Sequence, residues 1–196
     1  MPERKATLSR ETKETKVKVE IALDGSGVAS VSTGIGMLDH LLDQLARHGL
    51  FDLTVEASGD FATIDAHHSV EDIGIVLGQA FNNALGDRAG IVRMAHAIVP
   101  LDEALALVAV DLSGRGYAVI DGEFKPAGQL TGTLIEHFIE TFARESRNNI
   151  HIQILSGADG HHVAECVFKA LARSLDAACR IDERRGGSVP STKGTL

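Results

Sequence analysis

A short histidine-rich pattern occurs once in each half of this chain and constrains its fold and chemistry more than any other feature. The copies read His-His-Ser-Val-Glu from His67 and His-His-Val-Ala-Glu from His161. A further histidine precedes each copy by a similar distance, His40 in the first half and His137 in the second. Imidazole and carboxylate groups are common ligands of transition-metal ions. The repeat therefore predicts two matching halves that together bind two metal ions.

Hydrophobic periodicity predicts nearly the same order of elements in both halves. For the first half we expect strands over 16–23, up to residue 32 and over 51–57, with helices over 37–48 and 67–85. For the second half we expect strands over 95–99, 104–111, 117–120 and 150–155, with helices over 131–145 and 161–179.

This order predicts an α+β fold class built from a duplicated strand-strand-helix-strand-helix unit, with one extra strand in the second half. Each of two sheets would be covered on one face by helices, and the halves would be related by a pseudo-two-fold. The expected boundaries are 1–92 for the first repeat, 93–183 for the second, and 184–196 for a C-terminal loop.

Composition argues against several classes of function. The formal net charge of −8 disfavours general nucleic-acid binding, because neutralising phosphates requires a basic surface. No apolar run approaches the length that spans a bilayer, and the polar N-terminus does not resemble a signal peptide. Cys166 and Cys179 are too far apart along one predicted helix to form a disulfide. We therefore expect a cytoplasmic protein with reduced thiols and no membrane contact.

The spacing within each repeat predicts how the metal ligands are shared. Residues four apart lie on one face of a helix, so His67 and Glu71 can reach one ion together, whereas His68 is turned away from it. The second copy follows the same rule. The simplest arrangement gives each ion three imidazoles and one carboxylate: His67, Glu71, His137 and His162 in one set, and His161, Glu165, His40 and His68 in the other. Such a donor set suits Mn, Fe or Zn.

Several further motifs occur in order along the chain. They are Gly-Met-Leu-Asp-His at 36–40, His-His-Ser-Val-Glu-Asp-Ile-Gly at 67–74, Asp-Glu-Ala-Leu at 102–105, Asp-Leu-Ser-Gly-Arg at 111–115 and Ser-Thr-Lys-Gly at 191–194. Together they resemble the imidazoleglycerol-phosphate dehydratase family, and the resemblance extends from residue 10 to residue 196.

The resemblance implies a monofunctional dehydratase of histidine biosynthesis that converts imidazole glycerol phosphate to imidazole acetol phosphate and water. It implies two Mn ions, which would favour the imidazolate form of the substrate and so help to expel the adjacent hydroxyl. It also implies ligands drawn from neighbouring subunits of a homo-oligomeric closed shell, usually of about 24 chains.

The resemblance further assigns roles to individual residues. By family position Glu14 is the candidate acid/base group. The implied catalytic set is Glu14, His40, His67, His68, Glu71, His161, His162 and Glu165. The candidates for binding substrate, mostly through its phosphate, are Glu14, His48, Arg93, Arg115, Lys169, Ser191, Thr192 and Lys193. Of these, Lys169 and His48 are included because each lies eight residues from a predicted ligand on the same predicted helix, His161 and His40 respectively. A C-terminal segment carrying Ser191, Thr192 and Lys193 could close over the substrate as a lid.

Two other classes of function remain open from the sequence. One is a two-metal phosphatase or other hydrolase, although no bridging pair of aspartates is visible. The other is a non-catalytic protein in which metal ions only hold subunits together. Release of inorganic phosphate would favour the hydrolase, and indifference to replacement of Glu14 would favour the assembly protein.

Overall fold

The two halves of the chain fold as two copies of one unit. The computed structural model describes residues 3–59 and 65–196. The first half comprises β1 (Lys5–Glu11), β2 (Thr15–Ala22), β3 (Ala29–Ser32), α1 (Gly36–Gly49), β4 (Asp52–Gly59) and α2 (His67–Leu85). The second comprises β5 (Met94–Leu101), β6 (Ala104–Asp111), β7 (Tyr117–Asp121), α3 (Gly132–Ser146), β8 (Asn149–Ser156) and α4 (Gly160–Cys179), and a 3-10 helix η2 (Glu183–Arg185) follows it.

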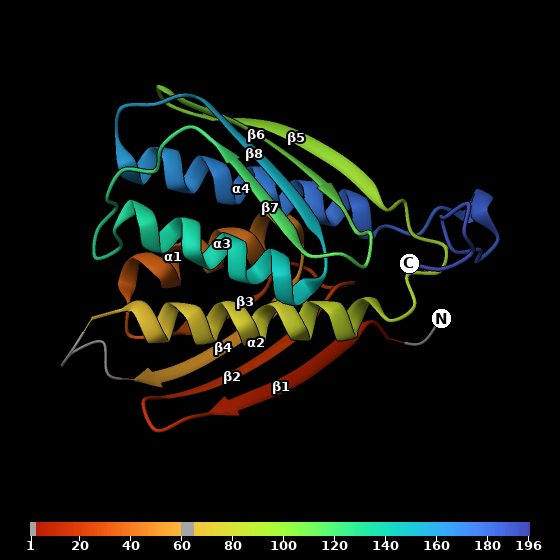
Figure 1. Cartoon of the computed structure of the whole chain (residues 1–196), viewed down its shortest axis with the longest axis horizontal. Helices are drawn as coiled ribbons and strands as arrows, with labels where there is room; N and C mark the ends of the chain where they lie inside the picture. Colours follow the sequence, from red (N-terminus) through yellow and green to blue (C-terminus); the bar gives the residue numbers. More distant parts are fainter. Residues whose placement is uncertain (1–2, 60–64) are drawn as a thin grey trace.

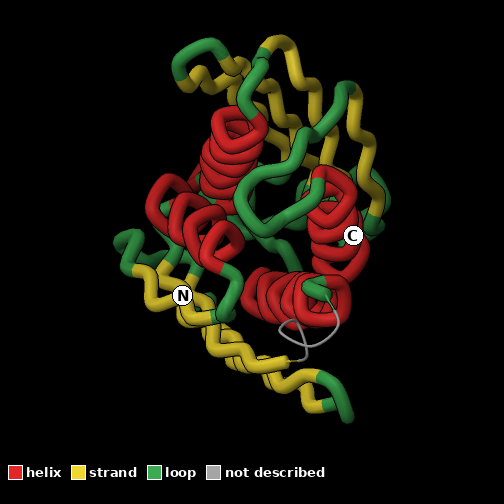
Figure 2. The backbone as a smooth tube through the Cα atoms, turned by 90° about the vertical axis from the view of Figure 1, so that its left-hand side faces the viewer, coloured by secondary structure: helices red, strands yellow, loops and turns green. Residues whose placement is uncertain are grey.

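The two sheets have the same topology. Their strand orders are β1-β2-β4-β3 and β5-β6-β8-β7. In each sheet the third strand of the unit pairs in parallel with the fourth, and the other pairings are antiparallel. The sheets lie on the outside and the four helices fill the space between them (Figures 1 and 2). The duplicated α+β fold with sheets covered on one face is confirmed.

The sequence interpretation missed the first strand, β1. Its only apolar residues are Ala6 and Leu8, so the alternation that marks a strand is weak. β1 lies at the edge of its sheet, where charged side chains are tolerated and discourage pairing with other chains. With β1 in place the first half has the same four strands as the second, so the extra strand is not peculiar to the second half.

Helix packing joins the halves into one hydrophobic core. α2 packs against α3 and α1 against α4, so each helix pair has one member from each half. Gly78 of α2 allows close approach to α3, because a Cβ there would lie 2.7 Å from the Cβ of Glu145 and 3.0 Å from the carbonyl oxygen of Phe142. These two helix pairs carry the candidate metal ligands.

The thiols of Cys166 and Cys179 are buried and free, as expected from their spacing. Within residues 3–59 and 65–196, no helix combines the length and the apolar character that crossing a membrane requires.

Candidate metal centre

Both tandem histidine pairs lie in the first turn of a long helix, and an aspartate two residues before each pair accepts a hydrogen bond from the helix backbone. Asp159 is the N-cap of α4, whereas Asp65 lies just before Ala66, the N-cap of α2. Asp65 accepts a hydrogen bond from the amide of His67 at 2.8 Å, and Asp159 accepts one from the amide of His161 at 2.7 Å. Such hydrogen bonds satisfy amides that have no partner inside the helix. They stabilise the first turns of α2 and α4, from which the histidines project.

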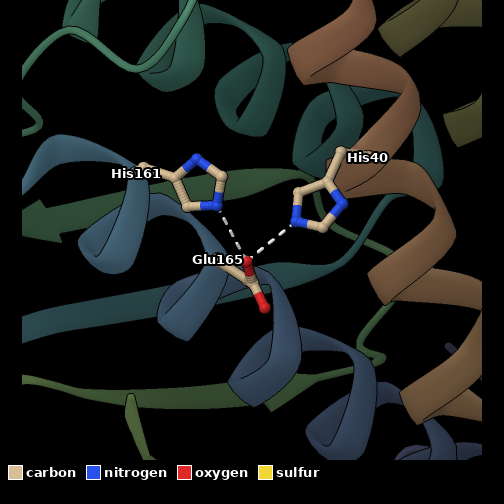
Figure 3. Close-up of side chains that lie close together, drawn as sticks. All are labelled: His40, His161 and Glu165. Atoms are coloured by element: carbon tan, nitrogen blue, oxygen red, sulfur yellow. Dashed lines mark hydrogen bonds and ion pairs between the residues drawn. The ribbon is translucent and has the colours of Figure 1, made fainter. Parts of the chain in front are cut away.

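The first cluster lies where α1 meets α4 (Figure 3). The Nε2 atoms of His40 and His161 lie 2.8 Å and 3.1 Å from the same oxygen of Glu165, Oε2. One ligand atom from each of these residues lies within 4.8 Å of the others. Three candidate ligand atoms thus converge on one point, although His40 is distant in sequence from the other two residues.

Glu165 remains ionised because of its neighbours. Its other oxygen, Oε1, lies 2.6 Å from the ammonium nitrogen of Lys169, one helical turn further along α4. Burial alone would raise the pKa of Glu165, but hydrogen bonds with His40 and Lys169 outweigh it and hold that pKa at about 2. A carboxylate that stays charged is the form that binds a cation.

The second cluster lies where α2 meets α3. It consists of His67 and Glu71 of α2 and His137 of α3, again with ligand atoms within 4.8 Å of one another. The rings of His67 and His137 are stacked with centroids 4.8 Å apart, and Nε2 of His137 is 3.6 Å from Glu71 Oε1. This Nε2 atom is buried and has no hydrogen-bond partner among residues 3–59 and 65–196. Because buried polar nitrogens normally have partners, its environment fits a bound cation.

The two remaining histidines of the repeats point elsewhere. Neither His68 nor His162 belongs to either cluster of the described residues. Each is nearly perpendicular to its neighbour in the tandem pair, with an interplanar angle of 89° in both halves. His68 Nδ1 lies 3.5 Å from Glu14 Oε2, and His162 Nδ1 lies 2.7 Å from Glu103 Oε2. The structure therefore brings together three of the four residues in each expected set.

The candidate phosphate-binding residues gather in a surface hollow between the 111–115 turn and the C-terminal segment. Arg93, Arg115, Ser191, Thr192 and Lys193 all line it. Gly114, with φ of 77°, allows the chain end to pack there, because a Cβ would lie 2.7 Å from the carbonyl carbon of Leu196.

Arg93 is held by contacts within the chain. Its Nε and Nη2 donate to the two oxygens of Asp111 at 2.7 Å and 3.0 Å, and Nη1 donates to the carbonyl oxygen of Pro190 at 2.7 Å. The hydrogen bond with Asp111 raises the pKa of Arg93. Arg93 thus anchors the C-terminal segment beside Arg115.

Lys169 and His48 lie near the first cluster and do not line the phosphate hollow. His48 Nε2 is 3.1 Å from Oε1 of Gln44 on the same helix. Burial lowers the pKa of His48, and the positive charges of Lys169 and Arg173 lower it further. His48 therefore remains neutral at neutral pH.

Two residues in these regions were not singled out from the sequence. Arg185 of η2 lines the phosphate hollow. Its buried Nε lies 4.0 Å from Asp182 Oδ2 and has no hydrogen-bond partner in the part of the chain that is described. Glu103 contacts His162 and lies in the turn between β5 and β6. Isolated charges in turns are usually solvated, so the sequence gives no means of distinguishing Arg185. Glu103 belongs to the 102–105 motif of the family resemblance, and that motif was the signal that could have identified it.

The fold and the clusters define a duplicated two-sheet α+β protein with paired histidine–glutamate sites between its helix pairs. Comparison with known proteins identifies the family. The sequence model described as imidazoleglycerol-phosphate dehydratase matches residues 33–175. The chain belongs to the imidazoleglycerol-phosphate dehydratase family, whose members are metal-dependent hydro-lyases of histidine biosynthesis that act on a small-molecule substrate.

Individual relatives agree along the whole chain. Imidazoleglycerol-phosphate dehydratase of Dehalococcoides mccartyi is 55% identical, covering 100% of this chain and 99% of that protein. The Roseiflexus protein of the same name is also 55% identical and covers 98% of both chains. The Pyrococcus furiosus crystal structure is 37% identical, with a TM-score of 0.82 over 96% of this chain and 100% of that one. The Staphylococcus aureus crystal structure is 31% identical, with a TM-score of 0.80 over 91% of this chain and 99% of that one.

Proposed function

We propose that the chain converts imidazole glycerol phosphate to imidazole acetol phosphate and water at a site holding two Mn ions. The convergence of imidazole and carboxylate groups in two matched clusters carries this proposal. His40, His161 and Glu165 would hold one ion, and His67, Glu71 and His137 the other. A bound metal ion supplies Lewis-acid stabilisation of negative charge on the substrate ring. The mixed nitrogen and oxygen donors suit Mn, and the family resemblance selects it among the metals that would fit.

Proton transfer in this reaction falls to Glu14. It lies in the turn between β1 and β2, close to His68 and half-exposed, so a substrate can reach it. Loss of water requires a proton for the departing hydroxyl and removal of another from carbon. A carboxyl group held near the substrate can exchange both.

The substrate phosphate would bind in the hollow near the C-terminal segment. Arg115 and Lys193 supply positive charge, and the Ser191 hydroxyl can donate a hydrogen bond to a phosphate oxygen. The hydrogen bond from Arg93 to the carbonyl oxygen of Pro190 holds this segment in place.

The product distinguishes this function from the alternatives. We expect the purified chain to form the ketone product with Mn²⁺ present, to lose turnover after chelation, and to recover it when Mn²⁺ is restored. Release of inorganic phosphate without ketone would indicate a hydrolase. Metal-dependent assembly without any turnover would indicate a protein that only uses metals to associate.

We also propose that the chain assembles into a homo-oligomer, with about 24 subunits as in the family, and that the metal sites are completed between copies. In a single chain each cluster has three ligands, and the fourth expected ligands, His162 and His68, lie outside them. A neighbouring copy could supply each missing imidazole. Assembly and metal binding would then be coupled.

The outer faces of the two sheets support self-assembly. The β1–β4 sheet presents polar residues such as Lys16, Lys18 and Glu20. The corresponding face of the β5–β8 sheet presents Ile98, which is 55% exposed, and also Met94, Tyr117 and Leu155. Several large exposed apolar side chains on one face of a sheet are typical of an interaction surface. Because the two sheets have the same topology, the difference reflects the surroundings of each and not the needs of the fold.

We expect Ile98→Lys to reduce the mass of the assembly measured by light scattering, because a charge would be buried where the copies meet. Ser9→Lys is the matched control: Ser9 pairs with Lys18 in the first sheet as Ile98 pairs with Leu107 in the second. The control should leave the mass unchanged. An unaltered mass for Ile98→Lys would show that this face is not an interface.

Removing residues 191–196 tests the role of the C-terminal segment. Loss of the Ser191 and Lys193 contacts should raise KM by at least about tenfold, since hydrogen bonds to charged groups contribute roughly 1.5–3 kcal/mol. Inorganic phosphate should also become a weaker competitive inhibitor. Unchanged affinity for both would exclude this segment from phosphate binding. Replacing the exposed Arg180, which is paired with Asp176 on α4, by Gln provides a charge control outside the hollow.

A further inference from the structure

We propose that Glu103 is a positioning residue that fixes the ring of His162 so that its Nε2 atom is presented to a metal ion. The inference rests on the proposed metal-dependent function, but it concerns a carboxylate that is not itself a ligand.

The two halves place a glutamate at corresponding points. Glu14 lies in the turn that joins β1 to β2, and Glu103 lies in the turn that joins β5 to β6. Each faces Nδ1 of the second histidine of the nearby repeat, His68 and His162 respectively. The duplicated unit therefore carries the same pair of groups twice.

The contacts of the two glutamates differ. Oε1 of Glu103 accepts hydrogen bonds from the amides of Ala158 and Asp159 at 3.1 Å and 2.9 Å, while Oε2 lies 2.7 Å from His162 Nδ1. In the part of the chain described, the Glu14 carboxylate has only the 3.5 Å contact with His68. Glu103 is thus held from both sides, whereas Glu14 keeps its oxygens available for a substrate.

The hydrogen bonds of Glu103 determine which nitrogen of His162 carries a lone pair. Oε1 of Glu103 accepts two backbone amides and Oε2 faces the ring of His162; because a carboxylate is ionised at neutral pH, both oxygens act as acceptors. An ionised carboxylate can only accept, so Nδ1 of His162 must carry the proton in this contact. Nε2 lies 3.9 Å from the nearest oxygen of Asp102, beyond hydrogen-bonding distance, and is left to bind a ligand.

The same carboxylate links this ring to the start of α4. The backbone amide of Asp159 donates a hydrogen bond to Glu103. The side chain of Asp159 in turn caps the helix by accepting hydrogen bonds from the amides of His161 and His162. Glu103 therefore fixes the ring and the helix end relative to each other. Carboxylates that receive the second ring N–H of a metal-binding histidine orient that ligand, and replacing them typically weakens metal affinity about 10- to 100-fold.

Glu103→Gln tests the inference with little change in size. All three partners of Glu103 are donors, and Gln has one acceptor oxygen in place of two, so its amide N–H₂ must face a donor. We expect Mn²⁺ titration of the metal-stripped chain by calorimetry to show about 10- to 100-fold weaker binding at one of two sites. Glu123→Gln, an exposed residue of the same half, removes the same charge and should not change either affinity.

Two further variants separate a positioning role from a general loss of structure. His162→Ala should weaken the same site, and adding Glu103→Gln to it should cause no further loss, because the carboxylate then has no ring to orient. Glu14→Gln should leave both Mn²⁺ affinities unchanged. An additive loss in the double variant, or normal binding by Glu103→Gln, would overturn the inference. Failure of the unaltered chain to bind Mn²⁺ would instead overturn the proposed function.

Discussion

Replacing Glu14 by Gln is expected to lower kcat by about 10²- to 10⁴-fold, the range that general acid–base groups contribute. Gln keeps the size and polarity of the side chain but cannot exchange a proton in this way. Glu14 lies outside both histidine–glutamate clusters, so metal content and assembly mass should not change. The measurement is steady-state turnover of imidazole glycerol phosphate, with metal analysis and light scattering on the same sample.

Glu11→Gln is the matched control for this substitution. Glu11 lies at the end of β1, is exposed and pairs with Lys16 at 3.5 Å. Removing its charge should leave kcat within a factor of about two, because exposed ion pairs contribute little. Normal turnover by Glu14→Gln would remove Glu14 from the mechanism and would favour a protein whose metals serve only assembly.

Sharing of ligands between copies predicts that two inactive variants restore each other. His137→Ala and His162→Ala should each lower turnover at least about 100-fold, because a metal ion supplies several kcal/mol of transition-state stabilisation. In a mixed assembly, the His162→Ala chain still supplies His67, Glu71 and His137. A neighbouring His137→Ala chain still supplies His162, so one complete ligand set can form between them. Random mixing of equal amounts should then restore about one quarter of the sites.

The experiment requires dissociating both variants by chelation, mixing them, and reassembling them with Mn²⁺ before measuring turnover. A mixture of two batches of His137→Ala is the control and should stay inactive. If the mixed variants also stay inactive while reassembling to full size, each site takes all its ligands from one chain. Recovery would establish that the sites are formed between subunits.

Much of the fold could be predicted from the sequence because its pattern is strong where elements are buried on one face. The long helices α2 and α4 begin at the histidine pairs, where the sequence analysis placed them. The missed strand β1 has only Ala6 and Leu8 to indicate its buried face. An edge strand is held by backbone hydrogen bonds to its neighbour, and these bonds leave little trace in side-chain composition.

The candidate site could be predicted in part for a similar reason. Spacing on a helix places His67 with Glu71 and His161 with Glu165 without knowledge of the rest of the fold. Two other contacts could not be predicted: the hydrogen bond between Glu103 and His162, and the one from Arg93 to the carbonyl oxygen of Pro190. Both depend on turns whose positions no local pattern specifies. The strands of the second sheet alternate like any half-buried strand. Only the assembled sheet shows that Met94, Ile98 and Tyr117 are exposed on its outer face.

The sequence by itself determined the duplication, the helical faces and the residue types that bind metal, because these follow from the period of the backbone and from side-chain chemistry. The expected ligand sets already placed His40 with the histidine and glutamate of α4, and His137 with those of α2. Only the tertiary structure decided how they come together, since helices from opposite halves must pack together to bury their apolar faces. It also decided that His68 and His162 turn away from both clusters. The helix fixes the direction in which a histidine ring projects. Which side chains the ring then contacts depends on elements that are distant in sequence.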